Sequence, residues 1–322
     1  MQYRHTFINQ YLSIKVNTNS KRVHKLIGNF LDFKDRSNSL PKIKIDFYLD
    51  EIRHKSQDDD KNFLYQNWPD KNNILLSSLG SKIATVITDP KAGVVKGSIL
   101  NYQESFKERI LDFVFTQPLH FILARHRLFF LHSSVVSKGR DCILIAGPQY
   151  SGKSTLALAL AQNGFNLLAD DDCFVKLVGK QAQLFPFLTK MGLNDKILER
   201  YQELKKHTLK NYRYGGKRRI SLNAISSSNN IKGLRCKMII FPKYKADRNM
   251  SMEQLSKKEG LDRLAKENLT IYDKERFPKL SINNFKALYN LTRQANSFEL
   301  TYNDTNLNKI AGAIKKVGNF KD

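Results

Sequence analysis

The chain has 322 residues, of which 41% are hydrophobic, 11% aromatic and 26% charged. These fractions support a folded core, and the scarcity of glycine (16) and proline (8) excludes collagen-like and low-complexity chains. Lys and Arg outnumber Asp and Glu by 54 to 30, a net charge of +24 that suits an anionic partner but that a Lys-, Asn- and Ile-rich composition also produces.

Residues 1–105 are predicted to form a β-rich amino-terminal region. Apolar runs separated by turn residues indicate strands at residues 13–16, 42–48, 73–76, 83–87 and 94–100. The run 55–61 contains three consecutive aspartates and is expected to be a solvated connector. No Pro-, Gly- or Ser-rich linker marks a boundary near residue 105, so this region either folds independently or packs on the domain that follows.

Residues 106–322 are predicted to form one α/β domain. Apolar residues at helical spacing indicate a helix over residues 106–128, kinked or divided at Pro118. A strand is expected over residues 128–136, and the apolar run 142–146 is typical of a strand buried on both faces.

The remainder of this domain alternates predicted helices with strands, which indicates a largely buried sheet. Asn194 or Asp195 is expected to cap a helix that runs to about residue 206, and residues 237–241 are expected to form a buried strand. Three further helices are predicted. The first is opened by the capping-box spacing of Ser256 and Glu259. The second starts at Ser281 and carries Phe285, Leu288 and Leu291 on one face, and the third is capped by Asp304 and carries Leu307, Ile310 and Ile314 on one face.

The strongest signal is the segment 147–155, which fits the phosphate-loop pattern GxxxxGK[ST] in full. An apolar strand precedes it, and a leucine-rich helix follows it and ends at Gly164. Backbone N–H groups of such a loop bind phosphate oxygens, Lys153 reaches the outer phosphates, and the Ser154 hydroxyl binds Mg²⁺. The predicted site for ATP and Mg²⁺ is formed by Gly147, Pro148, Gln149, Tyr150, Ser151, Gly152, Lys153, Ser154 and Thr155.

Three carboxylates, Asp170, Asp171 and Asp172, directly follow a short apolar run at residues 165–169. Near a phosphate loop, one carboxylate can bind Mg²⁺ and another can accept the proton of a hydroxyl. Three adjacent carboxylates beside a triphosphate would repel it without a metal, which favours Mg²⁺ as a cofactor. Ser154, Asp170 and Asp171 are therefore the predicted metal ligands.

His132 lies just before the strand that leads into the loop, in the sequence Leu131-His-Ser-Ser-Val-Val136. A lone histidine in an apolar run is more often a hydrogen-bonded core residue than a catalytic one. His132 gains interest only from its place beside the loop and the aspartates.

These three signals together resemble the carboxy-terminal catalytic domain of HPr kinase/phosphorylase, a family similar to the nucleotide-binding core of phosphoenolpyruvate carboxykinase. The resemblance extends over residues 130–175. It implies that His132, Lys153 and Asp171 take the positions of the catalytic histidine, the P-loop lysine and the general base. The whole layout, with its β-rich amino-terminal region, looks closer to HPr-kinase-like proteins found beside peptide-modification genes, several of which are thought to phosphorylate a peptide or small-molecule hydroxyl.

The chain also departs from that family. Residues 1–105 do not resemble its regulatory domain, and its glycine-rich signature with a second magnesium carboxylate is missing, which leaves Asp170, Asp172 or Glu199 for that role. Arg213, Arg218 or Arg219, near the pair Gly215–Gly216, either adds charge at the transition state from a mobile lid or belongs to a solvated basic loop.

The preferred interpretation is a P-loop serine kinase-like phosphotransferase that uses ATP and Mg²⁺ to phosphorylate a hydroxyl, with serine of a peptide or small protein as the first choice. The alternatives are a catalytically silent ATP-binding sensor or scaffold, and a small-molecule kinase. Residues 204–246 carry twelve Lys and Arg and no acidic residue, but no helix-turn-helix or zinc finger accompanies them, so nucleic acid is a disfavoured partner.

Cysteine and apolar patterns limit the cellular setting. Cys142, Cys173 and Cys236 are odd in number and form no CxxC pair, which disfavours a disulfide framework and a cysteine-rich zinc site. Neither a secretory leader nor a run of 18 apolar residues is found. We therefore expect a cytoplasmic protein without a membrane span, and a homo-oligomer is left open.

Overall fold

The computed structural model describes residues 2–8, 12–30, 43–52, 65–69, 75–79, 84–100, 102, 107–186, 190–214, 217–222, 225, 234–269, 272, 274–275 and 277–320. The chain is a mixed α/β protein that divides into two compact units, Met1–His126 and Arg127–Asp322. The division lies after His126, whereas the boundary predicted from the sequence is near residue 105. The predicted connector at residues 55–61 and the pair Gly215–Gly216 lie outside the described residues.

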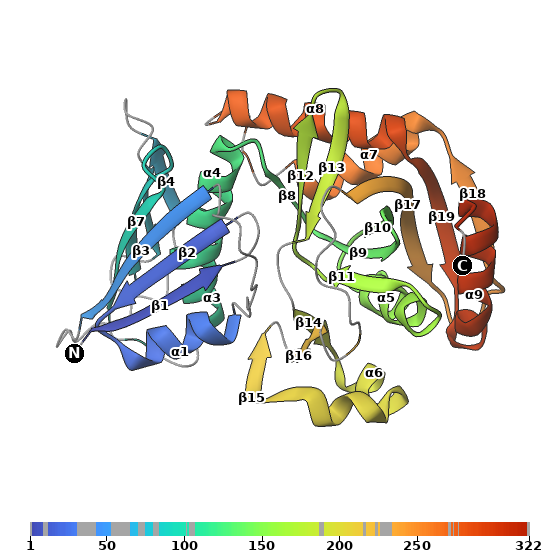
Figure 1. Cartoon of the computed structure of the whole chain (residues 1–322), viewed down its shortest axis with the longest axis horizontal. Helices are drawn as coiled ribbons and strands as arrows, with labels where there is room; N and C mark the ends of the chain where they lie inside the picture. Colours follow the sequence, from blue (N-terminus) through green and yellow to red (C-terminus); the bar gives the residue numbers. More distant parts are fainter. Residues whose placement is uncertain are drawn as a thin grey trace. The chain divides into compact units, whose positions relative to one another are not determined.

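The first unit is a seven-stranded sheet with helices packed on one face (Figure 1). Its strands, in the order in which they pair, are β1 (Tyr3–Ile8), β2 (Leu12–Thr18), β3 (Ile43–Ile52), β7 (Val94–Leu100), β6 (Ala84–Asp89), β5 (Leu75–Leu79) and β4 (Tyr65–Pro69). Buried and more exposed residues alternate along β2 and β3, as expected for a sheet with one face on a core. The predicted strands of this region are therefore confirmed, and β1 and β4 were missed.

Helical segments cover the buried face of this sheet. They are α1 (Lys21–Phe30), α3 (Lys107–Leu111), the π-helix η2 (Asp112–Thr116) and α4 (Gln117–Arg125). Phe47 of β3 packs against Phe115 of η2 with ring centroids 4.5 Å apart. Pro118 lies in the first turn of α4, directly after η2. The backbone is right-handed helical at Thr116 and Gln117, so the predicted helix changes its hydrogen-bond pattern near Pro118 rather than ending there.

The second unit is built on a nine-stranded sheet. Its main path runs through β11 (Asn166–Ala169), β9 (Ser133–Lys138), β10 (Asp141–Ala146), β17 (Leu234–Tyr244), β13 (Gln181–Pro186), β12 (Cys173–Val178) and β8 (Phe129–Leu131), and β19 (Asn296–Tyr302) pairs with both β17 and β18 (Ser251–Leu255). β10, β17 and β19 are parallel to one another, whereas β9 is antiparallel to its neighbours β10 and β11.

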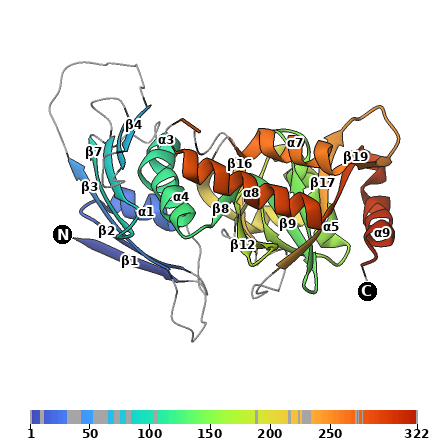
Figure 2. The ribbon, with the colours of Figure 1, turned by 90° about the horizontal axis from the view of Figure 1, so that it is seen from above.

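Helices cover both faces of the second sheet (Figures 1 and 2). On one face lie α5 (Lys153–Gln162) and α9 (Leu307–Gly318), whose apolar side chains share a core cluster with Ile143 and Ile145 of β10. On the other face lie α7 (Lys257–Asn268) and α8 (Pro278–Gln294). Because both faces are covered, β10 is buried along nearly its whole length, which explains its continuous apolar sequence.

Strand direction brings three distant segments to one edge of this sheet. β10 ends at Ala146, and β11, which runs in the same direction because both strands are antiparallel to β9, ends at Ala169. The start of β9 lies at the same edge, since Ser133 pairs with Ala146 and Ser134 with Ile145. The segment 147–155, the aspartates after β11 and the residues around His132 therefore meet at one place.

The strand predicted over residues 128–136 is wrong as a single element. It is two strands, β8 and β9, interrupted at His132. β8 pairs with β12, whereas β9 pairs with β10 and β11, so the two halves are drawn to different partners in the sheet. His132 lies at the break, where the backbone leaves one pairing and enters another.

A separate three-stranded sheet follows in the second unit. It pairs β14 (Lys190–Leu193), β16 (Lys217–Ser221) and β15 (Thr208–Tyr214) in that order. Between β14 and β15 lie α6 (Asp195–Arg200) and the 3₁₀-helix η3 (Gln202–His207), so the single helix expected to residue 206 is shorter than predicted. Asn194 caps α6, since its side chain accepts a hydrogen bond of 2.9 Å from the N–H of Ile197.

Other predicted boundaries are confirmed or corrected. Ser256 and Glu259 form the predicted capping box at the start of α7. α8 begins at Pro278 rather than Ser281, and Phe285 is 44% exposed whereas Leu288 and Leu291 are buried, so the prediction that the three share one face is wrong for Phe285. The cap before the last helix is Asn303 rather than Asp304, and a short 3₁₀-helix, η5 (Asp304–Asn306), precedes α9. No helix among the described residues is long and apolar enough to cross a membrane.

Candidate functional site

The segment 147–155 forms a tight connection between the end of β10 and the start of α5. Gly147 and Gly152 have φ of +150° and +99°, conformations that side-chain-bearing residues rarely adopt. The hydroxyl of Tyr302, at the end of β19, donates a hydrogen bond of 2.8 Å to the carbonyl of Gly152, and a Cβ at Gly152 would overlap that hydroxyl. The second glycine is therefore required both by the backbone conformation and by the closeness of Tyr302.

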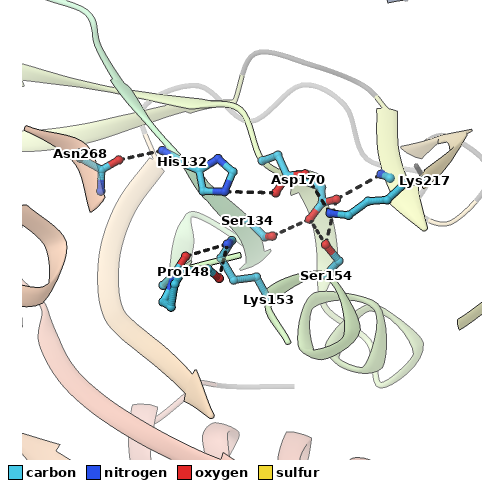
Figure 3. A network of polar contacts seen from close by, with 11 residues as sticks. His132, Ser134, Pro148, Lys153, Ser154, Asp170, Lys217 and Asn268 are labelled. Carbon is cyan, nitrogen blue, oxygen red and sulfur yellow. Dashed lines mark hydrogen bonds and ion pairs between the residues drawn. The ribbon is translucent and has the colours of Figure 1, made fainter. Parts of the chain in front are cut away.

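Lys153 is the first residue of α5, and its side chain turns back over the loop. Its Nζ donates hydrogen bonds to the carbonyls of Gly147 at 2.7 Å and Pro148 at 3.1 Å (Figure 3). The residue is only 5% exposed. Burial lowers the pKa of Lys153, while Asp171 and Asp170 raise it. The ammonium thus lies inside the loop, beside the helix amino terminus, in a place suited to an anionic ligand.

Asp170 follows β11 and is completely buried. Its Oδ1 accepts hydrogen bonds from the hydroxyls of Ser134 at 2.6 Å and Ser154 at 2.9 Å. Its Oδ2 accepts one from the backbone N–H of Gly192 at 3.3 Å. Burial and the neighbouring Asp171 raise the pKa of Asp170 to about 6, against the opposing effect of these hydrogen bonds and of Lys217. Asp170 is therefore fixed in orientation by groups from three different elements, namely β9, α5 and β14.

Asp171 differs from its neighbour in both conformation and charge. Its φ of +66° is rare for a residue with a side chain. Oδ2 lies 3.5 Å from Nζ of Lys217, and Oδ1 lies 3.8 Å from Nε2 of His132. Burial would raise the pKa of Asp171, but the positive charges around it, led by Lys217, lower it below its ordinary value. The pKa values of the two adjacent carboxylates are thus shifted in opposite directions: Asp170 is more easily protonated than an ordinary aspartate, and Asp171 is more easily ionised.

His132 is tied to the site from its backbone. Its N–H donates a hydrogen bond of 2.8 Å to the side-chain oxygen of Asn268, the last residue of α7 (Figure 3). Asn268 is itself buried and donates to the carbonyl of Leu264 at 2.8 Å. Burial and Lys153 lower the pKa of His132, while Asp171 opposes them, and the net shift favours the neutral imidazole. A neutral imidazole can accept a hydrogen bond from a bound hydroxyl or donate one to it.

The residues present fit a nucleotide with Mg²⁺. Ser151 Oγ is buried in the loop and has no hydrogen-bond partner among the described residues, which a phosphate oxygen would supply. Hydroxyl and carboxylate oxygens of Ser154 and Asp170 are the ligand type that Mg²⁺ prefers. The described residues contain no group of three or more His, Cys, Asp and Glu side chains suited to a metal. Mg²⁺ would therefore depend on phosphate oxygens and water for most of its ligands.

The remaining predicted residues are spread around this centre. Gln149 and Tyr150 are exposed on the outside of the loop, Tyr150 with φ of +65°, whereas Thr155 and Asp172 are half-buried. Glu199 is exposed on α6, so no observation joins it to the aspartates. Arg218 donates a hydrogen bond of 2.9 Å to the exposed Asp195, on the strand face opposite to Arg219, so we do not assign it to the site. Arg219 is buried, and its charge lowers the pKa of Asp171.

Sequence reasoning missed four residues of the site. Ser134 and Asn268 fix Asp170 and His132, and Lys217 and Gly192 approach the aspartates from the three-stranded sheet. Ser134 could have been found, because it lies two residues after His132, and residues two apart in an extended chain point to the same face. Lys217 could not, since it is one of many lysines in a basic stretch.

Comparison with known proteins adds little to this geometry. No family model and no curated protein matches the sequence. Among solved structures, the HPr(Ser) kinase/phosphatase from Coxiella burnetii is similar with a TM-score of 0.30 and 12% identity, over 59% of this chain and 95% of that one.

Proposed function

We propose that the second unit is a MgATP-dependent phosphotransferase that transfers the γ-phosphoryl group to a hydroxyl, with serine of a peptide or small protein as the preferred acceptor. One observation carries the proposal. Two adjacent carboxylates lie at the mouth of a glycine-bounded loop, one bonded to the Ser154 hydroxyl and the other flanked by His132 and Lys217. Phosphoryl transfer needs these two roles side by side.

The loop side of the site would bind the nucleotide. Lys153 would exchange its bonds to the loop carbonyls for bonds to phosphate oxygens, and backbone N–H groups at the start of α5 would add theirs. Ser151 would gain the partner that its buried hydroxyl lacks among the described residues. Ser154 and Asp170 would bind Mg²⁺, which neutralises charge on the phosphates.

The other side of the site would activate the acceptor. Asp171 is ionised at neutral pH and would take the proton of the acceptor hydroxyl as that oxygen bonds to phosphorus and the bond to ADP breaks. His132 lies beside Oδ1 of Asp171 and would orient the hydroxyl through a hydrogen bond. When two neighbouring carboxylates have pKa values shifted in opposite directions, they can take separate chemical roles in one site.

Asp171→Asn tests this function directly. The substitution preserves shape and removes the base, so transfer is expected to fall about 100- to 10,000-fold while MgATP affinity is retained. The measurement is intact-mass analysis after co-expression with each small protein encoded beside the gene. A phosphate-sized gain on one neighbour, absent with Asp171→Asn and with Lys153→Ala, would support the proposal.

Asp141→Asn is the matched control, because Asp141 lies at the opposite end of β10, bonded to Arg235 and Lys237. Its variant should transfer as the parent does. Transfer at the parental rate by Asp171→Asn would remove Asp171 as the base.

A silent ATP-binding sensor is the second candidate, because Glu199, one residue considered for the second magnesium carboxylate, is exposed on α6. Tight MgATP binding without turnover on any protein or small alcohol would select it. Transfer to a small alcohol alone would instead identify a small-molecule kinase.

A further inference from the structure

The three-stranded sheet presents two chemically different faces. Met191 and Leu193 of β14 and Ile220 of β16 are buried in the core cluster. Because side chains alternate along a strand, the opposite face carries Lys217 and Arg219 of β16, and their neighbour across the ladder is Gly192, which pairs with Arg219. The sheet therefore directs Lys217 and Arg219 to the side on which Asp170 and Asp171 lie, whereas Arg218 lies on the opposite face.

Gly192 is the point at which this sheet comes closest to the aspartates. Its N–H donates to Oδ2 of Asp170 at 3.3 Å. A Cβ at Gly192 would lie 3.0 Å from Cδ of Lys217 and 3.4 Å from Nη1 of Arg219, so both basic side chains cross directly over it. The backbone of Gly192 lies outside the left-handed region, so space rather than conformation calls for glycine here.

The side chain that crosses Gly192 ends on Asp171. Nζ of Lys217 lies 3.5 Å from Oδ2, while Nε2 of His132 lies 3.8 Å from Oδ1. Lys217 and His132 approach from opposite sides (Figure 3). One carboxylate oxygen is thereby paired with a cation, and the other is left toward the histidine and the loop.

We infer that Lys217 is a positioning residue that acts through Asp171, and that Gly192 provides the gap through which it reaches. By pairing with Oδ2, Lys217 fixes the rotation of the carboxylate so that Oδ1 faces the acceptor hydroxyl beside His132. The inference rests on the proposed phosphotransferase function and adds to it a residue from a sheet that neither the loop nor the aspartate motif includes.

Substitution of Lys217 gives the main test. The probe is γ-labelled MgATP with a degenerate library of serine-containing peptides, and label is counted on peptide and as free phosphate. Lys217→Met should lower kcat about 10- to 100-fold with KM for MgATP unchanged within about twofold, because misorientation of a reacting group costs rate rather than nucleotide binding. Lys217→Arg should recover part of the rate, and added alkylamine should partly rescue Lys217→Ala.

Arg218→Met is the matched control. It removes one positive charge from the same strand, but Arg218 pairs with the exposed Asp195 on the other face. Its kcat should equal that of the parent. A loss equal to that of Lys217→Met would show that the net charge of the strand, rather than the contact with Asp171, sets the rate, and would overturn the inference.

Gly192→Ala gives a second, independent variant. The added methyl group displaces the Lys217 side chain, so kcat should fall in the parent but fall no further in Lys217→Met. Additive losses, or an unchanged kcat in a folded Lys217→Met, would overturn the role of Lys217 and leave the proposed function standing. No label transfer by the parent to peptide or water would overturn both.

Discussion

The two large sheets of this protein differ in whether their polar residues are exposed or buried. In the first unit, β2 and β3 alternate buried and more exposed positions, so their polar side chains face outward and need no further explanation. In the second unit, β9 and β10 are buried along almost their whole length, with helices on both faces. Polar groups at the edge of that sheet are buried, although no gain in structural stability accounts for the loss of their hydration.

Buried charge makes the contrast sharper. Among the residues whose side chains are described, the buried charged ones are Lys153, Asp170, Lys190 and Arg219, and all belong to the second unit. Buried charges cost free energy unless they are paired, so natural chains keep them mainly where chemistry requires them. The contrast supports the proposal that the polar edge of the second sheet is the functional site.

Replacing one lysine in each unit, Lys153 at the start of α5 and Lys44 on β3, should show the largest difference. Lys153→Met should lower nucleotide-dependent transfer about 100- to 1,000-fold, because the charge opposite the outer phosphates is lost. It should change the free energy of unfolding by no more than about 1 kcal/mol, because loss of the hydrogen bonds to the Gly147 and Pro148 carbonyls is offset by removal of a buried charge. Steady-state transfer assays and urea unfolding check both parts.

Lys44→Met is the control in the first sheet, where Lys44 is exposed on β3. It should change the unfolding free energy by less than about 0.5 kcal/mol and leave transfer unaltered. A marked loss of stability in Lys153→Met would instead give Lys153 a structural role and weaken the contrast between the sheets.

Substitution of one glycine in each unit should have an effect of intermediate size. Gly152→Ala and Gly93→Ala each force a side chain into a left-handed conformation and against a neighbour, the Tyr302 hydroxyl in one case and the Lys44 carbonyl in the other. Each should destabilise its own unit by about 1–3 kcal/mol. Only Gly152→Ala should also lower MgATP affinity, by about tenfold or more, which isothermal titration would measure. Equal loss of affinity in Gly93→Ala would contradict the assignment.

The sequence predicted those parts of the site that are continuous in the chain. The strand, loop and helix around Lys153 are adjacent segments with local signals, and Asp170 and Asp171 follow directly from the end of the next strand. Fold class was accessible for the same reason, because alternation of helix and strand is a local pattern.

What the sequence could not predict depends on pairing between distant segments. The apolar run around His132 reads as one strand, and only the competition of β12 with β10 and β11 for its two halves breaks it there. Lys217 lies 46 residues from Asp171 in the chain and meets it through a separate sheet. Phe285 has the spacing of a buried residue on α8, but the face that packs on the sheet is turned away from it.

The smallest expected effect is a difference in pH response between the two units. Burial lowers the pKa of His120, in α4 of the first unit, to about 3, so its contribution to stability is full above 6.5 and is lost as the pH falls below that value. Burial raises the pKa of Asp170 in the second unit to about 6, so its contribution is full below 3.8 and is lost as the pH rises through about 6. Asp171 is held ionised and titrates below this interval.

Between pH 7 and pH 5 the first unit should therefore lose stability while the second gains it, each by about 1–2 kcal/mol. The loss should be at the lower end, because the His120 side chain keeps some exposure to water. Native-state hydrogen exchange on the full chain, corrected for the intrinsic rate, separates the two units by peptide. His120→Gln should flatten the first slope alone and Asp170→Asn the second alone. Slopes of the same sign in both units, unaffected by these substitutions, would show that the buried histidine and the buried aspartate do not set the pH response of the units that contain them.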